Sequence, residues 1–270
     1  MFTNAIVRPP CSRFAEGLTS IDMGAPNYAR ALQQHAAYCK ALEECGLTLT
    51  QLEADERCPD STFVEDTAVM MRALPHEQAS ALATSATRAI LTRPGASSRA
   101  GEVESVGEVL SRFFPELHSI QEPGTLDGGD VCEAEDHFFI GVSERTNEAG
   151  AHQLAKLLAS DGYTSSFVDI RGVKSVLHLK SGLAYLGNNR LAVIDALADH
   201  KAFRRYDLLR VNAMEQYAAN CLRINDYVLV ADGFPEFEGA LQNRGYKTLS
   251  VEMTEFQKMD GGLSCLSLRF

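Results

Sequence analysis

The sequence predicts an α/β fold in which five similar units close into a ring. Two observations carry this prediction. A strand, a helix and a second strand recur in the same order along the chain, and a polar segment with a further short apolar strand follows each unit. Units that cannot bury an apolar face alone must stack on their neighbours, and the lack of capping repeats favours a ring over an open solenoid. A doubly wound parallel sheet built from five generic pieces is the alternative that periodicity leaves open.

The unit that begins at His137 is the clearest. Its apolar run predicts a strand over 137–142, followed by a helix over 147–158 and a second strand over 165–170. Asp161, Gly162 and Tyr163 form the break between the helix and the second strand. The other predicted first strands are 5–8, 88–92, 190–194 and 226–231.

The first and last units repeat this order with different loops. In the first unit we expect a helix over 27–45 and a strand over 47–52, with Gly46 between them. In the last unit we expect a helix over 235–242 and a strand over 247–252. The Ala- and Ser-rich stretch Ala79–Ala89 is interpreted as an extra helix or an extended loop of the second unit.

The polar segments are the places where reactive side chains gather. If the units form a ring, equivalent positions of these segments point to one place near its axis. The polar segments with their short strands are 58–66, 124–131, 177–182, 219–224 and 261–270.

Composition limits the class of protein. A chain of 270 residues with 45% hydrophobic content can bury a large core, and without a linker or a low-complexity segment we expect one domain over 1–270. The net charge of −11 opposes binding to nucleic acid and attracts cationic ligands. Neither a signal sequence nor an apolar run of membrane-spanning length is visible, so a cytoplasmic protein without membrane contact is expected.

The seven cysteines are scattered, and none is spaced as a metal ligand from another cysteine or a histidine. Reduced thiols are therefore expected, with no metal and no cofactor.

A ring of this kind brings one cysteine and one histidine together with a group of carboxylates. Cys265 follows a Gly-Gly turn and lies just inside the predicted last strand, and His178 lies in the polar segment 177–182. A thiolate nucleophile surrounded by acids suits a cationic substrate, and a guanidinium would itself help to ionise the thiol. The carboxylates in question are Asp60, Glu65, Asp66 and Asp127.

Each residue has a plausible role in guanidinium chemistry. Asp66 and Asp127 can hold the planar guanidinium by paired, charge-assisted hydrogen bonds. His178 can protonate a leaving amine and then activate water. Taken singly, Cys265 fits a buried strand cysteine, His178 a core histidine and Asp127 a tight turn, so the assignment depends on their combination.

At this point the sequence resembles a known family along nearly its whole length. It resembles the dimethylarginine dimethylaminohydrolases, within the guanidino-group-modifying pentein superfamily. The motifs that carry the resemblance are Pro59-Asp60 with 63–66, 92–96 with Ser98-Arg99, 124–130, 145–147 with Gly150, 177–180, and 260–270.

The resemblance implies a five-bladed α/β propeller, the pentein fold, and a triad of Cys265, His178 and Asp127. It also implies a cofactor-free hydrolase, a monomer or homodimer, that converts Nω-methylated arginines into citrulline and dimethylamine or methylamine through a covalent thiouronium on the cysteine.

For the substrate pocket, the resemblance implies that Arg99 and Arg145 clamp the α-carboxylate of the substrate. Backbone groups of two further residues contact its amino-acid end, and the loop 17–26 acts as a lid. The implied pocket carboxylates and backbone contacts are Asp60, Glu65, Asp66, Leu18 and Met259.

Two departures from the family pattern affect the pocket rim. The stretch between Asp66 and Arg93 is longer than in compact members, and Ala100 stands where a second arginine is common.

Arginine deiminase chemistry is the nearest alternative function, although the additional helical domain of those enzymes is missing. A non-catalytic propeller is the alternative of another class, and the complete triad disfavours it. A doubly wound dehydrogenase is disfavoured because no Gly-x-Gly-x-x-Gly follows a strand.

Overall fold

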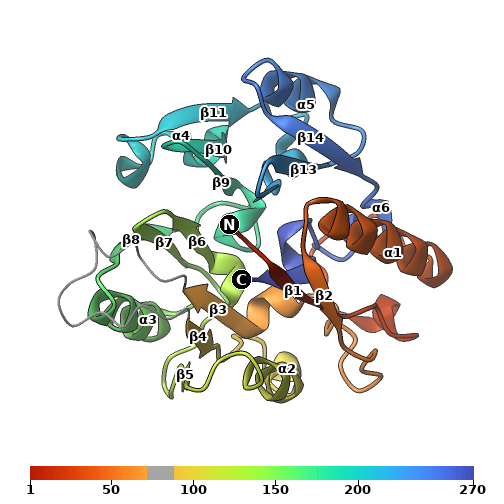
Figure 1. Cartoon of the computed structure of the whole chain (residues 1–270), viewed down its shortest axis with the longest axis vertical. Coiled ribbons are helices and arrows are strands. Elements are labelled where there is room, and N and C mark those ends of the chain that lie inside the picture. The colour runs from red at the N-terminus through yellow and green to blue at the C-terminus, as the bar shows by residue number, and fades with distance from the viewer. Residues whose placement is uncertain (72–87, 175) are drawn as a thin grey trace.

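The computed structural model describes residues 1–71, 88–174 and 176–270, and these residues form five three-stranded sheets arranged around a central axis (Figure 1). In blade order, the sheets are β15 (Ser267–Arg269), β1 (Asn4–Val7) and β2 (Thr48–Gln51); β3 (Ala68–Met71), β4 (Arg88–Leu91) and β5 (Leu117–Ser119); β6 (Val131–Ala134), β7 (His137–Val142) and β8 (Thr164–Asp169); β9 (Leu183–Gly187), β10 (Arg190–Ile194) and β11 (Asp207–Val211); and β12 (Leu222–Ile224), β13 (Tyr227–Ala231) and β14 (Lys247–Val251).

All five sheets have the same topology. The middle strand runs antiparallel to the first strand and parallel to the third, as Ile6 shows by pairing with Leu268 on one side and Thr50 on the other. The five predicted units are therefore confirmed as blades of an α/β propeller, and the single doubly wound sheet is excluded.

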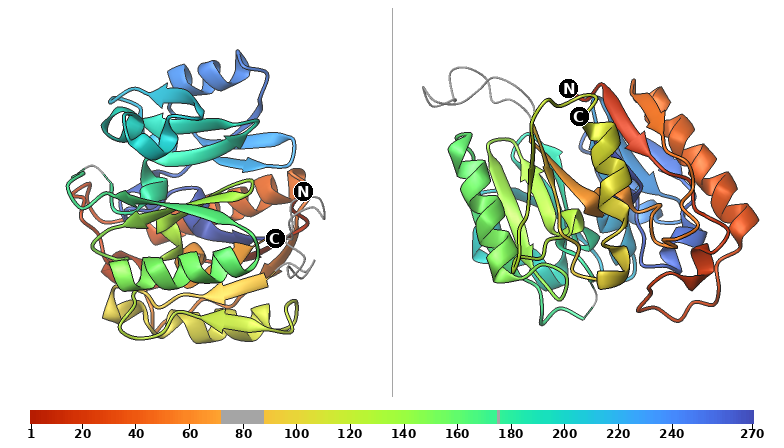
Figure 2. Two further views of the ribbon diagram at one scale, coloured as in Figure 1. Left: turned by 90° about the vertical axis from the view of Figure 1, so that its left-hand side faces the viewer. Right: turned by 90° about the horizontal axis from the view of Figure 1, so that it is seen from below.

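Helices connect the middle strand of each blade to its third strand, as a parallel pair requires. They cover the outer side of the ring, where Figure 2 shows α1 in orange, α2 in yellow and α3 in green. The described helices are α1 (Tyr28–Glu44), α2 (Glu102–Leu110), α3 (Glu148–Ser160), α4 (Asp195–Ala198), α5 (Pro235–Gln242) and the short α6 (Thr254–Gln257).

The helix starts follow local chemistry that the sequence contains. Asn27 and Asn147 cap α1 and α3, since their side chains accept the backbone N–H of Arg30 and Gly150. Pro235 occupies the first turn of α5, where its missing N–H costs nothing. The helix predicted over 235–242 has the observed limits, whereas α3 runs two residues beyond the predicted 158.

The ring closes through the two ends of the chain. β1 pairs with β15, and the backbone N–H groups of Thr3 and Asn4 both donate to the carbonyl of Phe270. Both termini lie near the axis in Figure 1. The first blade is thus complete only when the last strand of the chain joins the first.

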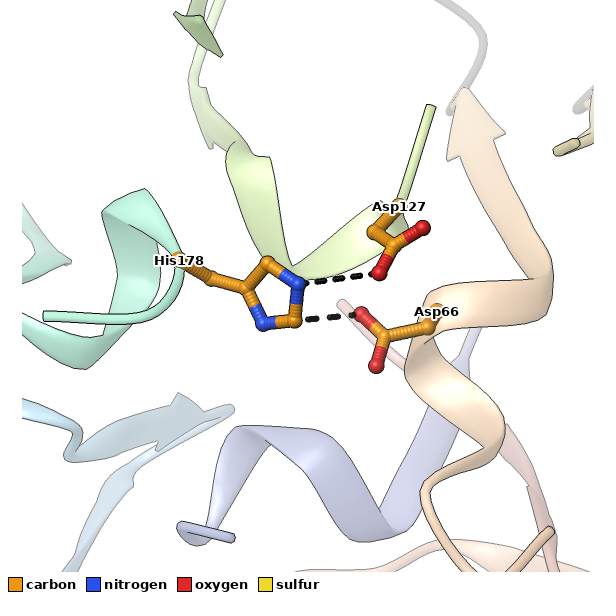
Figure 3. A group of neighbouring side chains, drawn as sticks. All are labelled: Asp66, Asp127 and His178. Atoms are coloured by element: carbon orange, nitrogen blue, oxygen red, sulfur yellow. Dashed lines mark hydrogen bonds and ion pairs between the residues drawn. The ribbon is translucent and has the colours of Figure 1, made fainter. Parts of the chain in front are cut away.

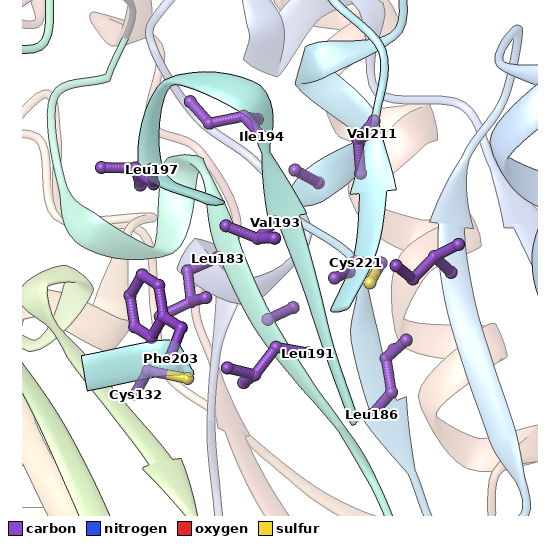
Figure 4. Packing of buried hydrophobic residues seen from close by; sticks show 14 of the residues in the cluster. Cys132, Leu183, Leu186, Leu191, Val193, Ile194, Leu197, Phe203, Val211 and Cys221 are labelled. Carbon is purple, nitrogen blue, oxygen red and sulfur yellow. The ribbon is translucent and has the colours of Figure 1, made fainter. Parts of the chain in front are cut away.

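Apolar side chains fill the space between neighbouring blades. In the largest cluster, Leu183, Leu191 and Val193 of the fourth blade pack with Cys132 of the third blade and Cys221 of the fifth (Figure 4). Burial raises the pKa of each of these two thiols to about 12, so both are inert hydrophobic groups. All seven cysteines are free thiols, as expected from their spacing.

None of the helices in the described ranges is long and apolar enough to cross a membrane. The extra helix or loop predicted over 79–89 lies mostly outside the described residues, and its last two positions, Arg88 and Ala89, belong to β4.

Candidate active site

A short 3₁₀ turn precedes the first strand of each blade, and the reactive side chains lie in these turns or next to them. Asp66 belongs to the turn Val64–Thr67, and Asp127 and His178 immediately precede the turns Gly128–Asp130 and Leu179–Ser181. Cys265 was expected inside the last strand. It lies instead in the turn Ser264–Leu266, because β15 starts only at Ser267.

The imidazole of His178 faces two carboxylates, those of Asp127 and Asp66 (Figure 3). Its Nε2 is 3.0 Å from Oδ2 of Asp127, and its Nδ1 is 4.0 Å from Oδ1 of Asp66. Burial opposes charge on the imidazole, but Asp66, Asp127 and Asp130 outweigh it and raise the pKa of His178 to about 9. The ring is therefore an imidazolium at neutral pH and can give up a proton.

Asp66 remains ionised although it is buried. Its Oδ1 accepts the backbone N–H of Gly129 at 2.8 Å, and its Oδ2 lies 2.5 Å from Nη1 of Arg99. Burial acts to raise its pKa, but His178 and Arg99 overcome this and hold the pKa of Asp66 at about 2. Asp66 is thus a fixed negative charge beside the cavity.

Asp127 supports His178 and does not face the cavity. Its Oδ1 accepts the backbone N–H of Gly95 at 2.8 Å while its Oδ2 meets His178, and the residue is fully buried. The expectation that Asp127 holds a guanidinium together with Asp66 is therefore wrong, since both of its oxygens are engaged away from the cavity. Its position is that of the acid in a triad.

Cys265 is half-buried, and its Sγ accepts the backbone N–H of Gly262 at 3.4 Å. Burial, followed by the charges of Glu65 and Asp66, raises the pKa of the Cys265 thiol to about 12. The resting thiol is consequently protonated, and an incoming cation is needed to stabilise the thiolate.

A small cavity of about 30 Å³ lies between these groups, close to the volume of one water molecule. It brings together eight of the predicted site residues, and these come from four of the five blades and from the loops between them. Its lining is Leu18, Asp60, Phe63, Asp66, Arg99, Arg145, Leu177, His178, Met259, Asp260, Gly261 and Cys265.

The loop 17–26 is attached to the segment just before the nucleophile. Thr19 Oγ1 donates to the carbonyl of Lys258 at 3.0 Å, and the N–H of Ser20 donates to Asp260 at 2.5 Å. The N–H of Leu18 donates to both oxygens of Asp60 at 3.1 Å. Leu18 of this loop lines the cavity, so the loop forms part of the cavity wall.

Glu65 does not line this cavity. Its oxygens meet Lys180 Nζ at 2.7 Å, Arg269 Nη2 at 2.9 Å and Ser264 Oγ at 2.7 Å. It faces instead a channel of about 500 Å³ that all five inner strands line. Adjacent residues of the turn thus face opposite sides of this layer, and the role of Glu65 as a pocket carboxylate stays a prediction.

Arg99 and Arg145 differ in how strongly other groups bind them. Arg99 is only 4% exposed, and besides Asp66 it donates to Glu102 at 2.7 Å and to the carbonyl of Phe63 at 3.1 Å. Arg145 is half-buried and its guanidinium has no hydrogen bond within the described part of the chain. Arg145 is therefore the more available partner for a ligand carboxylate, and most donors of Arg99 are already used.

Two buried polar residues at the site were missed. Burial raises the pKa of Glu102 to about 7 against the opposing effect of Arg99. The available signal was the position of Glu102 at the start of a helix, three residues after Arg99 in the sequence. Asn220 lies in the polar segment 219–224, two residues before an inner strand as Asp66 and Cys265 do, and this place in the repeat could have revealed it.

Asp66, Asp127 and His178 are also the group among the described residues whose ligand atoms, all within 4.8 Å of one another, could hold a metal ion. In this structure these groups contact one another, Arg99 and backbone N–H groups. These contacts orient the imidazole for proton transfer.

Comparisons with known proteins identify the family of this chain. Residues 110–222 match the family model for arginine deiminase. The chain is 41% identical over 271 residues to the N(G),N(G)-dimethylarginine dimethylaminohydrolase of Pseudomonas aeruginosa, covering 100% of both chains. The Streptomyces coelicolor enzyme of the same name is 33% identical, over 98% of this chain and 96% of its own.

A solved structure of the P. aeruginosa enzyme, a cysteine-to-serine variant complexed with citrulline, covers 100% of both chains with a TM-score of 0.90 at 40% identity. Full-length identity and a shared fold lead to one conclusion. The chain belongs to the dimethylarginine dimethylaminohydrolases, a family of hydrolases built on the five-bladed pentein fold.

Proposed function

We propose that this chain hydrolyses Nω-methylated L-arginines to L-citrulline, with release of dimethylamine or methylamine. The observation that carries the proposal is the meeting of Cys265, His178 and Asp66 at one cavity, with Asp127 bonded to the imidazole. Membership of the family supports the same reaction.

The substrate is bound at both ends in this proposal. Asp66 faces the guanidinium and keeps its carbon near the sulfur of Cys265. At the other end, the guanidinium of Arg145 binds the α-carboxylate, and Asp60 with the backbone of Leu18 and Met259 binds the α-amino group. Arg99 acts mainly by holding Asp66.

In the first half of the reaction the bound cation lowers the pKa of Cys265, and the thiol releases its proton to solvent. A bond forms between Sγ and the guanidinium carbon, and the bond from this carbon to the methylated nitrogen breaks. His178 gives its proton to the departing nitrogen, so a neutral amine leaves and a thiouronium remains on Cys265.

In the second half, neutral His178 takes one proton from a water molecule whose oxygen attacks the thiouronium carbon. The carbon–sulfur bond then breaks, and the second proton of the water returns to the sulfur. Citrulline leaves, and Cys265 and His178 regain their starting protonation. Asp127 keeps the imidazole oriented throughout.

The test is citrulline release from asymmetric dimethylarginine, monomethylarginine and arginine, measured in parallel for the wild type and Cys265→Ser, with and without a chelator. Turnover of the methylated substrates that is lost in Cys265→Ser and unaffected by chelation is the expected result. Failure of the wild type to turn over any of the three compounds would contradict the proposal.

Arginine deimination is the second candidate, favoured by the match of residues 110–222 to the arginine deiminase model. The same groups would then release ammonia from unmethylated arginine. A larger kcat/KM for arginine than for both methylated substrates would support this alternative.

We further propose that residues 1–270 act as one catalytic domain, as a monomer or homodimer, without a cofactor and in the cytoplasm.

A further inference from the structure

Asn220 joins the turn that carries the nucleophile to the turn that carries the general acid. Its Nδ2 donates to the carbonyl of Lys180 at 3.0 Å and to Oγ of Ser264 at 3.2 Å, while its Oδ1 accepts the N–H of Ser264 at 2.9 Å. Lys180 follows His178 by two residues, and Ser264 directly precedes Cys265. One amide therefore bridges the two turns from a third blade.

This bridge matters because the two catalytic side chains share no hydrogen bond with each other in the described part of the chain. Their separation must be set by groups that contact both turns. Asn220 is only 6% exposed, so its hydrogen bonds are shielded from competition with water.

The same side chain also shapes the turn around the thiol. A Cβ at Gly262 would lie 2.5 Å from Cγ of Asn220, so the backbone of Gly262 packs directly on the amide. The N–H of Gly262 donates to Sγ of Cys265 at 3.4 Å. A shift of Asn220 would thus change the direction in which Sγ points.

The amide is chemically suited to this place because it offers a donor and an acceptor at once. The donor faces a carbonyl, and the acceptor faces an N–H. The network continues from Ser264, whose Oγ donates to Glu65 at 2.7 Å, and from Glu65 to Lys180. Hydrogen bonds and an ion pair thus link Ser264, Glu65 and Lys180 beside the cavity. Ser264 and Glu65 directly precede Cys265 and Asp66 in the chain.

We propose that Asn220 is a positioning residue for the reaction: it fixes the turn of Cys265 against the turn of His178, so that sulfur and imidazole meet the same guanidinium group. This inference rests on the proposed function. Asn220 lies in the one blade whose inner turn supplies none of Cys265, Asp66, Asp127 and His178.

The test compares Asn220→Ala with a matched control in the same blade. Asn225 also makes three inter-blade hydrogen bonds, with its side chain joined to the backbone of Phe2 and to the carbonyl of Cys45. Asn225→Ala therefore removes as many bonds as Asn220→Ala, but away from the cavity. For each variant we would measure kcat and KM for asymmetric dimethylarginine, the melting temperature, and the rate at which iodoacetamide alkylates Cys265.

We expect Asn220→Ala to lower kcat about 100-fold with KM within about threefold of wild type, since a displacement near 1 Å can cost this much. The alkylation rate at Cys265, which needs no substrate, should change at least about threefold, because the direction of Sγ changes. Asn225→Ala should lower the melting temperature without either effect. Asn220→Asp keeps the shape and the acceptor but places an oxygen against the Lys180 carbonyl. We expect its kcat to fall to a similar extent. This variant tests the inference if the alanine variant does not fold.

Equal losses of kcat in the Asn220 and Asn225 variants would overturn the inference, as would wild-type kcat and alkylation in a folded Asn220 variant. If the wild type turns over no methylarginine, the proposed function fails. The alkylation rates then still decide whether Asn220 positions the thiol.

Discussion

The imidazole of His178 and the carboxylate of Asp127 meet across a blade boundary, with Nε2 3.0 Å from Oδ2. His178 precedes the inner strand of the fourth blade and Asp127 that of the third, while Gly95, which binds the other oxygen of Asp127, follows the middle strand of the second. The carboxylate of Asp127 thus links three blades next to the imidazole that holds the proton.

Asp127→Asn tests this arrangement. The neutral amide can no longer stabilise the imidazolium, so we expect the pKa of His178 to fall and kcat to decrease by about 10²- to 10⁴-fold. Citrulline release as a function of pH measures both effects. Asp136→Asn, at an exposed turn between β6 and β7, is the control and should stay within about twofold of wild type. Unchanged kcat in Asp127→Asn would remove Asp127 from the mechanism.

The raised pKa of His178 also predicts a pH-dependent stability. Because the folded pKa of His178 is about 9 and the ordinary value is 6.5, its stabilising effect is fully present below pH 6.5 and is lost as the pH rises through 9. This difference in pKa corresponds to roughly 3–3.5 kcal/mol of unfolding free energy. Urea unfolding at pH 6, 7.5 and 9 should show this loss in the wild type, and a smaller loss in His178→Gln. Parallel curves for the two proteins would contradict the prediction.

The periodicity of the sequence predicts the blades well because each one repeats the same local signals. Asn at the start of α1 and α3 and Pro235 in the first turn of α5 mark helix starts within a residue or two. Closure of the ring was inferable only from the number of units and the lack of capping repeats, since the pairing of β1 with β15 joins residues from opposite ends of the chain.

The sequence predicts which residues belong to the site only where their position in the repeat determines it. Register places Asp66, Asp127, His178 and Cys265 at equivalent turns, but it does not show which way each side chain points. Glu65 and Asp66 are adjacent and face different cavities, and the burial of Arg99 by Glu102 depends on the packing of α2. Such contacts arise from tertiary structure and have no periodic signal.

Glu102→Gln should weaken substrate binding through Arg99. The carboxylate of Glu102 accepts from both Nε and Nη2 of Arg99, and Arg99 in turn holds Asp66. A charge-assisted hydrogen bond contributes about 1.5–3 kcal/mol, so we expect kcat/KM to fall at least about 10-fold, mainly through KM. Glu104→Gln, exposed on the same helix, should have no effect. A loss confined to kcat would instead assign Glu102 to the chemical step.

Alanine substitutions at Gly129 and Gly239 distinguish an effect on catalysis from an effect on stability. A Cβ at Gly129 would lie 2.7 Å from Nδ1 of His178 and 2.8 Å from Oδ1 of Asp66, so Gly129→Ala must push these two groups apart. We expect kcat to fall by about 100-fold or more. Gly239 lies inside α5 with nothing within 4 Å of the added carbon, and Gly239→Ala should raise the unfolding free energy by about 0.5–1 kcal/mol without changing kcat. Citrulline release and thermal melting of both variants provide the measurement. A folded Gly129→Ala protein with wild-type kcat would show that His178 and Asp66 need not keep their present spacing, which would contradict the assignment of both residues to one reaction centre.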